Sequence, residues 1–197
     1  LNSIRRIFIG FSIATILGVF LGYLIWRYQL IEDTLGFVVT ALQSIPSIVW
    51  FPVAIIWFGL NDFSILFIVT IGATWTMTIS ATSGFKNVPQ LYQRVAKTYG
   101  SSGLHFLRTV ILPASVPQLI SGLRIAWAFS WRALMAGELL GAGGGLGYLL
   151  ETGRSLGQMD LVISVMIIIA IIGTIMDNVV FLRLEKNVQR KWGVSQA

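Results

Sequence analysis

The sequence predicts an all-α, polytopic bundle of transmembrane helices, and three observations support this fold class. Of the 197 residues, 55% are apolar and only 11% carry a charge, less than half of the roughly 25% that is usual in a soluble domain. Five apolar stretches are each long enough to cross a hydrocarbon core of about 30 Å as a helix of about 20 residues. The stretches are evenly apolar, whereas the strands of a membrane barrel are short and alternate in hydropathy.

The predicted spans cover residues 7–26, 36–57, 63–85, 116–140 and 161–182 of a single domain, residues 1–197. In the first span, Gly18 and Gly22 have the spacing of closely packed membrane helices. Pro46 and Pro52 interrupt the second span, which either bends there or breaks beside a substrate route. Because the chain begins with Leu1 and not with Met, we expect a further N-terminal piece that includes another span.

The distribution of lysine and arginine predicts the orientation of the spans. If the chain starts outside, the cytoplasmic segments hold nine of the 14 basic residues, the outer segments hold three, and two lie within a span. Cytoplasmic loops are enriched in lysine and arginine, so this orientation is favoured and places the C-terminus in the cytoplasm. Arg5 and Arg6 lie on the outer side and disagree with the bias locally. Topology therefore accounts for the net charge of +6, and we expect no binding of nucleic acid.

Residues 86–115 form the one long cytoplasmic loop in this topology. The pattern over 91–99 predicts a short amphipathic helix that ends at Gly100, a residue type favoured just beyond helix C-termini. A second short helix follows, and Pro113 and Pro117 are expected to close it before the next span. Such a helix–Gly–helix segment is either a docking surface or a solvated connector.

The spacing of Ala96, Gly100, Leu112 and Pro113 resembles the Glu-Ala-Ala motif of permease subunits in binding-protein-dependent ABC importers. That motif has Glu-Ala-Ala, three residues, Gly, nine residues, Ile, any residue and Leu-Pro. Arg94 stands where the motif has Glu, so an acidic contact made there in other members cannot be made here. The resemblance to the nitrate, sulfonate, taurine and bicarbonate branch covers most of the chain. It extends to Leu1-Asn2-Ser3-Ile4-Arg5-Arg6 leading into Gly10-Phe11, Ile45-Pro46 with Pro52, Gly122-Leu123-Arg124, Glu138 and Gly145-Leu146-Gly147-Tyr148.

The resemblance implies a non-catalytic permease subunit that imports a small, anionic solute across a bacterial inner membrane. It also implies a second permease subunit in a homodimer, two cytoplasmic ATPase subunits that hold ATP and Mg²⁺, and an extracytoplasmic substrate-binding protein. The helices at 91–111 would then be coupling helices. The residues implied in the ATPase-coupling loop are Arg94, Ala96, Gly100, Leu112 and Pro113.

The chain itself lacks the residues of most catalytic, cofactor and metal sites. It has no cysteine and a single histidine, His105, which excludes most metal and thiol chemistry. The glycine-rich segment 141–147 is not followed by Lys-Ser or Lys-Thr, so it is not a nucleotide-binding P-loop. On the outer side, this segment is either a flexible connection or a contact for the binding protein.

The candidate pathway residues lie in the fourth and third spans and comprise Arg124, Arg132, Glu138, Thr74 and Thr78. An arginine within a span costs about 2.5–3.5 kcal/mol on insertion scales, so Arg132 needs a partner or a water-filled cavity. At about 100° per residue, the three charged residues can share one broad face. That face either attracts an anion along the pathway or forms structural ion pairs with neighbouring helices. The threonines either pack against a helix or line a wet passage.

Two other function classes are compatible with the spans. A secondary transporter driven by an ion gradient would show inverted repeats with acidic residues at the midplane, and the sequence shows no such repeat. A membrane scaffold subunit would use the loop at 86–115 to dock a partner that is not an ATPase. Co-purification of an ATPase through this loop distinguishes the importer from both alternatives.

Overall fold

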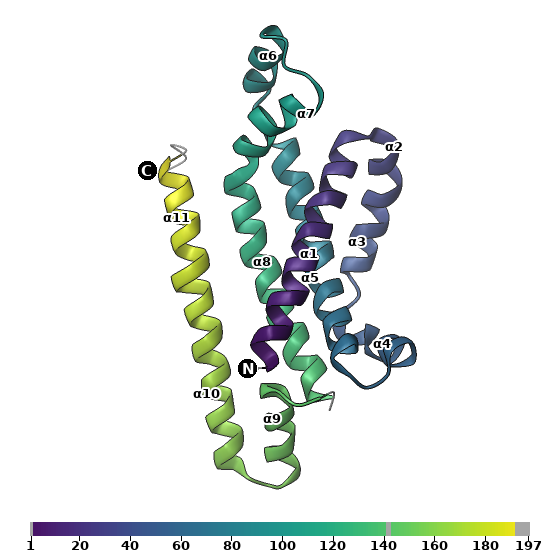
Figure 1. The fold of residues 1–197 in the computed structure, drawn as a ribbon, viewed down its shortest axis with the longest axis vertical. Helices are drawn as coiled ribbons and strands as arrows, with labels where there is room; N and C mark the ends of the chain where they lie inside the picture. Colours follow the sequence, from purple (N-terminus) through teal and green to yellow (C-terminus); the bar gives the residue numbers. More distant parts are fainter. Residues whose placement is uncertain (1, 141–142, 192–197) are drawn as a thin grey trace.

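The computed structural model describes residues 2–140 and 143–191, and every regular element in that part of the chain is helical (Figure 1). Three long helices form the centre: α1 (Asn2–Arg27), α5 (Asp62–Lys86) and α8 (Leu112–Leu139). A fourth long rod consists of α10 (Met159–Ile175), the π-helical η4 (Met176–Phe181) and α11 (Leu182–Lys191). The shorter elements are α2 (Gln29–Ile31), η1 (Glu32–Gly36), α3 (Phe37–Gln43), η2 (Ser47–Trp50), α4 (Phe51–Phe58), α6 (Gln90–Thr98), α7 (Gly103–Phe106), η3 (Leu107–Ile111) and α9 (Leu146–Ser155).

The number of apolar helices agrees with the predicted fold class. Within the described residues, four helices are long and apolar enough to cross a membrane, and a bent pair, Gln29–Gln43 with Ser47–Phe58, brings the number to five. In the most apolar stretch of α5, 50% of the residues are buried. In the most apolar stretch of the rod Met159–Val188, only 6% of the residues are buried. Helix α5 is therefore the central helix, and the rod leaves most of its surface to lipid or to another subunit.

The second predicted span is not one continuous helix. The two members of the bent pair meet at an angle of 96°. The break lies at Pro46, which has extended backbone angles and separates α3 from η2. Pro52 is expected to interrupt the span as well, but it does not. It stands in the first turn of α4, where backbone N–H groups have no intrahelical acceptor, so the missing N–H of proline costs no hydrogen bond.

The expected closure of the second loop helix at Pro113 and Pro117 is wrong. One continuous helix of 37 residues runs from Gly103 to Leu139 through both prolines. Proline lacks an N–H, and its ring collides with the carbonyl four residues earlier, which is that of Thr109 for Pro113. The π-helical turn η3 lies over this position, and its wider spacing lets the helix continue past the proline.

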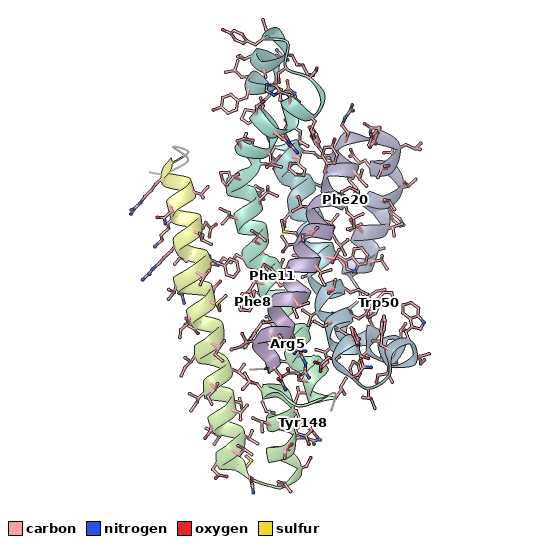
Figure 2. All side chains as sticks on the ribbon, in the orientation of Figure 1. Arg5, Phe8, Phe11, Phe20, Trp50 and Tyr148 are labelled. Carbon is pink, nitrogen blue, oxygen red and sulfur yellow. The ribbon has the colours of Figure 1, made fainter. Side chains whose placement is uncertain are left out.

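Helices α1 and α5 pack with their backbones close together, as the glycine spacing predicts. A Cβ atom at Gly18 would lie 2.6 Å from the Cβ of Met77, and one at Gly22 would lie 2.6 Å from the Cβ of Ala81. An aromatic cluster joins α1 to α8 and to the rod. The ring of Phe11, which Figure 2 labels on α1, lies 5.2 Å from that of Trp127 and 6.2 Å from that of Phe181.

The two ends of the bundle carry different elements. Helices α6 and α7 lie at one end, together with the C-terminal end of α11, whereas the start of α1 and all of α9 lie at the other (Figure 1). The polar features below are therefore described for the α6 end, for the interior and for the α9 end.

Candidate functional site

The loop at the α6 end is built on a helix terminus with defined geometry. Helix α6 ends at Thr98, and Gly100 follows with a φ of +77°, which a residue with a side chain rarely adopts. The N–H of Ser101 donates to the carbonyl of Ala96 at 3.0 Å, and that of Gly100 donates to Lys97 at 3.0 Å. These bonds form a Schellman motif, so Ala96 and Gly100 hold the turn between α6 and α7.

One face of α6 has no partner within the described chain. Leu91, Tyr92, Val95 and Tyr99 expose between 48% and 87% of their surface. The opposite side is anchored, since the amide of Gln93 donates to the carbonyl of Val88 at 2.9 Å. An apolar patch of this kind on a fixed helix is suited to docking another protein.

A groove separates this loop from the end of α1. It has a volume of about 620 Å³ and lies between the aromatic end of α1, at Tyr23 and Trp26, and the loop residues from Gln93 to Leu107. Gly100 has no atom within 4 Å of the position of a Cβ, so space does not restrict this residue. Its backbone conformation is what requires glycine.

The remaining loop candidates have less specific surroundings. Arg94, at the position of the motif glutamate, is exposed and donates only to Gln90 of its own helix, at 3.2 Å, within the described residues. Leu112 is 40% exposed, and Pro113 is partly buried inside the continuous helix.

In the interior, Arg124 is held in ion pairs with the outer rod. Its guanidinium binds Asp177 in a bidentate manner, with N–O distances of 2.6 and 2.7 Å, and reaches Glu185 at 3.2 Å. The hydroxyl of Ser121 also donates to Glu185, at 2.6 Å. These contacts attach η4 and α11, and with them the rod that begins with α10, to α8.

Thr74 and Thr78 lie in the packed interface of α1 and α5. Both side chains are buried, and each hydroxyl donates to the carbonyl four residues earlier in α5, at 2.7 and 2.8 Å. The carbonyls of Thr74 and Thr78 lie beside Gly18 and Gly22, respectively. This arrangement agrees with helix packing, and Thr78 also lines a cavity of about 290 Å³ beside α3.

Arg132 has a different environment from the other charged residues of α8. It is exposed, and within the described residues it makes no ion pair; its guanidinium lies 5.3 Å from the centre of the Phe129 ring. The three charges of α8 thus have different environments: Glu138 is fully buried, Arg124 is partly exposed and ion-paired, and Arg132 is exposed.

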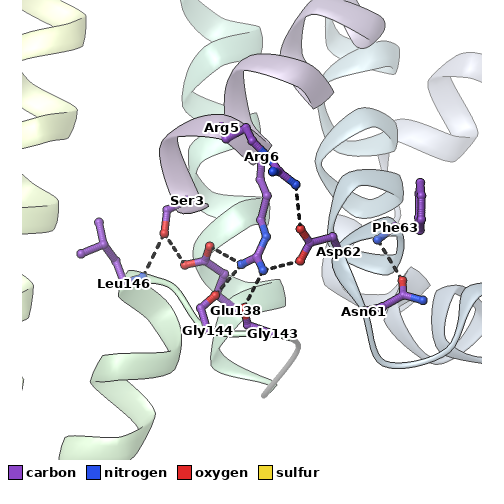
Figure 3. Close-up of polar contacts among 10 residues, drawn as sticks. All are labelled: Ser3, Arg5, Arg6, Asn61, Asp62, Phe63, Glu138, Gly143, Gly144 and Leu146. Atoms are coloured by element: carbon purple, nitrogen blue, oxygen red, sulfur yellow. Dashed lines mark hydrogen bonds and ion pairs between the residues drawn. The ribbon is translucent and has the colours of Figure 1, made fainter. Parts of the chain in front are cut away.

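Glu138 is the centre of a buried polar network at the α9 end (Figure 3). Its carboxylate is 0% exposed and accepts hydrogen bonds from Arg6 at 2.9 Å, from Ser3 at 2.9 Å and from the N–H of Gly147 at 3.0 Å. Arg6 is itself 1% exposed and reaches Asp62 at the start of α5. Four elements, α1, α5, α8 and the start of α9, therefore meet at one ion-pair network.

The glycine-rich segment completes this network. The carbonyls of Gly143 and Gly144 accept hydrogen bonds from Arg6 at 2.8 and 2.5 Å. A side chain at Gly145 would collide with the carboxylate of Glu138. The backbone of Gly143 and Gly144 thus holds the Arg6 side chain in place. Residues 141 and 142 of the segment lie outside the described residues.

The sequence indicates Ser3 and Arg6 only through the family resemblance and does not indicate Asp62, although the charge distribution contains a further signal for Arg6. Arg5 and Arg6 contradict the bias of basic residues toward the cytoplasmic side. An arginine against that bias, near the end of a span, indicates a local carboxylate partner. Glu138 is that partner for Arg6.

Comparison with known proteins places this architecture in a family. The model of the family described as "Binding-protein-dependent transport system inner membrane component" matches residues 14–193. A provisionally named ABC transporter permease protein of Methanocaldococcus jannaschii is 38% identical over 176 residues, which are 89% of this chain and 66% of that protein. The nitrate import permease NrtB of Synechocystis is 31% identical over 89% of this chain and 64% of its own length. The chain thus spans slightly less than two thirds of these curated relatives.

A solved structure shows the same fold. A chain from inward-facing MetNI, a methionine ABC transporter, has a TM-score of 0.84 at 17% identity, with 95% of this chain and 93% of that chain covered. The family match, the relatives and the apolar helices agree. The chain belongs to the family of inner membrane components of binding-protein-dependent transport systems, and it is a multi-pass membrane protein.

Proposed function

We propose that the chain is the permease subunit of an ATP-driven importer of a small anion, of the nitrate, sulfonate, taurine or bicarbonate class. Its relatives include permeases named for nitrate, bicarbonate and taurine. The proposal includes a second copy of the chain, two ATPase subunits that bind ATP and Mg²⁺, and an extracytoplasmic binding protein. The α6 end faces the cytoplasm in this proposal, and so does the C-terminus.

The observation that carries the proposal is the unpartnered apolar face of α6. The face belongs to a helix that is fixed at both ends, by Pro89 before it and by the Gly100 turn after it. Past η3, the second loop helix is continuous with α8. A movement of α7 would therefore reach α8 without a flexible joint, and a partner on α6 would act on α7 through the Gly100 turn.

Replacing Leu91 with glutamate tests whether an ATPase docks on this face. A charge at the centre of an apolar contact costs enough to reduce binding about tenfold or more, so we expect the ATPase that co-purifies with the wild-type chain to be lost. Leu156→Glu is the matched control, since Leu156 is similarly exposed, at 64% against 66%, but lies beside α9. Equal ATPase recovery with both variants would refute the docking.

Replacing Gly100 with valine tests the turn itself. The left-handed conformation costs a residue with a side chain about 1–2 kcal/mol, so the end of α6 is expected to change direction. We expect ATP hydrolysis to continue while anion uptake into proteoliposomes falls, with the ATPase still bound. Gly100→Asn is the control because asparagine tolerates this conformation. Wild-type uptake by the valine variant would contradict the role of the turn.

A further inference from the structure

We infer that the break between α3 and η2 forms, with α5 and Arg132, a binding site for a small oxyanion. The inference rests on the proposed import of an anion and adds a location for it in this chain. At the break, a cavity of about 40 Å³ is lined by residues of four elements, among them Gln43, Ser47, Trp75, Thr76 and Phe129.

The cavity lies where three elements approach one another closely. Gly72 of α5 stands between Ser47 of η2 and Ala133 of α8; a Cβ there would lie 3.1 Å from the Ser47 Cβ and 3.3 Å from the Ala133 Cβ. Arg132 is the residue beside Ala133, and its guanidinium lies 5.3 Å from the centre of the ring of Phe129, which lines the cavity. A cationic group therefore lies against one of the residues that line the cavity.

The lining supplies hydrogen-bond donors and no carboxylate. The buried indole N–H of Trp75 has no hydrogen-bond partner among the described residues. The amide of Gln43 makes a long bond of 3.4 Å to the Thr76 hydroxyl. A buried N–H without an acceptor is costly, and a rotation of the indole toward the cavity would let a small oxyanion supply the acceptor that it lacks.

The size and charge of the site restrict the ligand. A buried water needs about 10–15 Å³, so a cavity of 40 Å³ has room for about three water-sized groups. That fits the oxygens of a single planar or tetrahedral oxyanion head group and not a larger solute. Arg132 would neutralise one negative charge and so lower the cost of its own position within the span.

Indole NMR of the purified transporter in detergent, labelled with ¹⁵N-tryptophan, tests the site with sodium nitrate as the probe. The Trp75 signal is assigned by its loss in Trp75→Phe. We expect added nitrate to shift this signal, and equal sodium gluconate not to shift it. Trp127 is an internal control, because its buried indole N–H likewise has no partner within the described residues but lies outside the cavity.

Arg132→Gln is expected to raise the nitrate concentration for half-maximal shift at least about tenfold, since a bond to a charged donor is lost. Arg132→Lys should restore part of the affinity. No Trp75 shift in the wild type, or an equal shift in Arg132→Gln, would overturn the site. ATP-driven anion uptake by the wild-type complex is measured separately; its absence overturns the proposed function, whereas uptake without a Trp75 shift overturns only the site.

Discussion

Replacing Arg6 with glutamine is expected to lower the free energy of unfolding by about 3–5 kcal/mol, because Glu138 would keep a buried charge without its cationic partner. The carboxylate is 0% exposed, and its remaining donors within the described chain are the neutral Ser3 hydroxyl and the N–H of Gly147. It also lies at the C-terminal end of α8, where the helix dipole disfavours a negative charge. Thermal unfolding in detergent measures the loss.

The neighbouring Arg5 provides the matched control. It pairs with the same Asp62, at 3.2 Å, but its side chain is 70% exposed. We therefore expect Arg5→Gln to cost less than about 1 kcal/mol. A paired variant, Arg6→Met with Glu138→Met, should be more stable than Arg6→Gln, because no charge of the pair stays buried. It should not reach wild-type stability, because the Gly147 N–H and the Gly143 and Gly144 carbonyls lose their partners. Equal melting temperatures for Arg5→Gln and Arg6→Gln would show that the buried pair does not stabilise the fold.

Replacing Gly22 with alanine is expected to destabilise the chain by about 1–3 kcal/mol through overpacking. The added Cβ would lie 2.6 Å from the Cβ of Ala81 and 3.0 Å from backbone atoms of Thr78 and Thr82. Backbone atoms and a Cβ cannot rotate away, so α1 and α5 would have to separate along their main interface.

Gly36→Ala is the control for Gly22→Ala. Gly36 is also helical, in η1, but no atom lies within 4 Å of the position of its Cβ. This substitution should be neutral or slightly stabilising, since alanine favours helix over glycine. Unfolding in detergent of both variants separates the two effects, and a loss of stability at Gly36 equal to that at Gly22 would count against the close packing of α1 and α5.

Much of the fold could be predicted from the sequence, because hydropathy and helix-end signals are local. Evenly apolar stretches of about 20 residues predict the long helices, and the glycine at position 100 predicts the end of α6. The Gly18 and Gly22 spacing predicts a close helix contact, and the structure shows that α5 provides it. Each signal lies within a few residues of the feature that it determines.

The features that the sequence does not predict depend on distant residues or on how a proline is accommodated. Arg6 and Glu138 are 132 positions apart, so their pairing follows from the packing of α1 against α8 and not from any spacing. Pro113 indicates a helix end in sequence, yet the π-helical turn η3 absorbs it. The break at Pro46 follows the sequence, but the angle of 96° depends on the packing of η2 and α4 against α5.

The hydrogen bonds around Glu138 also limit how the helices of this chain can move relative to one another. The Glu138 carboxylate at the end of α8 accepts hydrogen bonds from the beginnings of α1 and α9. Arg6 of α1 also binds Asp62 at the start of α5. These helices cannot open at that end independently without exposing an unpaired charge. Under the proposed docking, a push on α6 would turn these helices as one block, and relative sliding would be left to the kinked α3–α4 arm, which makes none of these bonds.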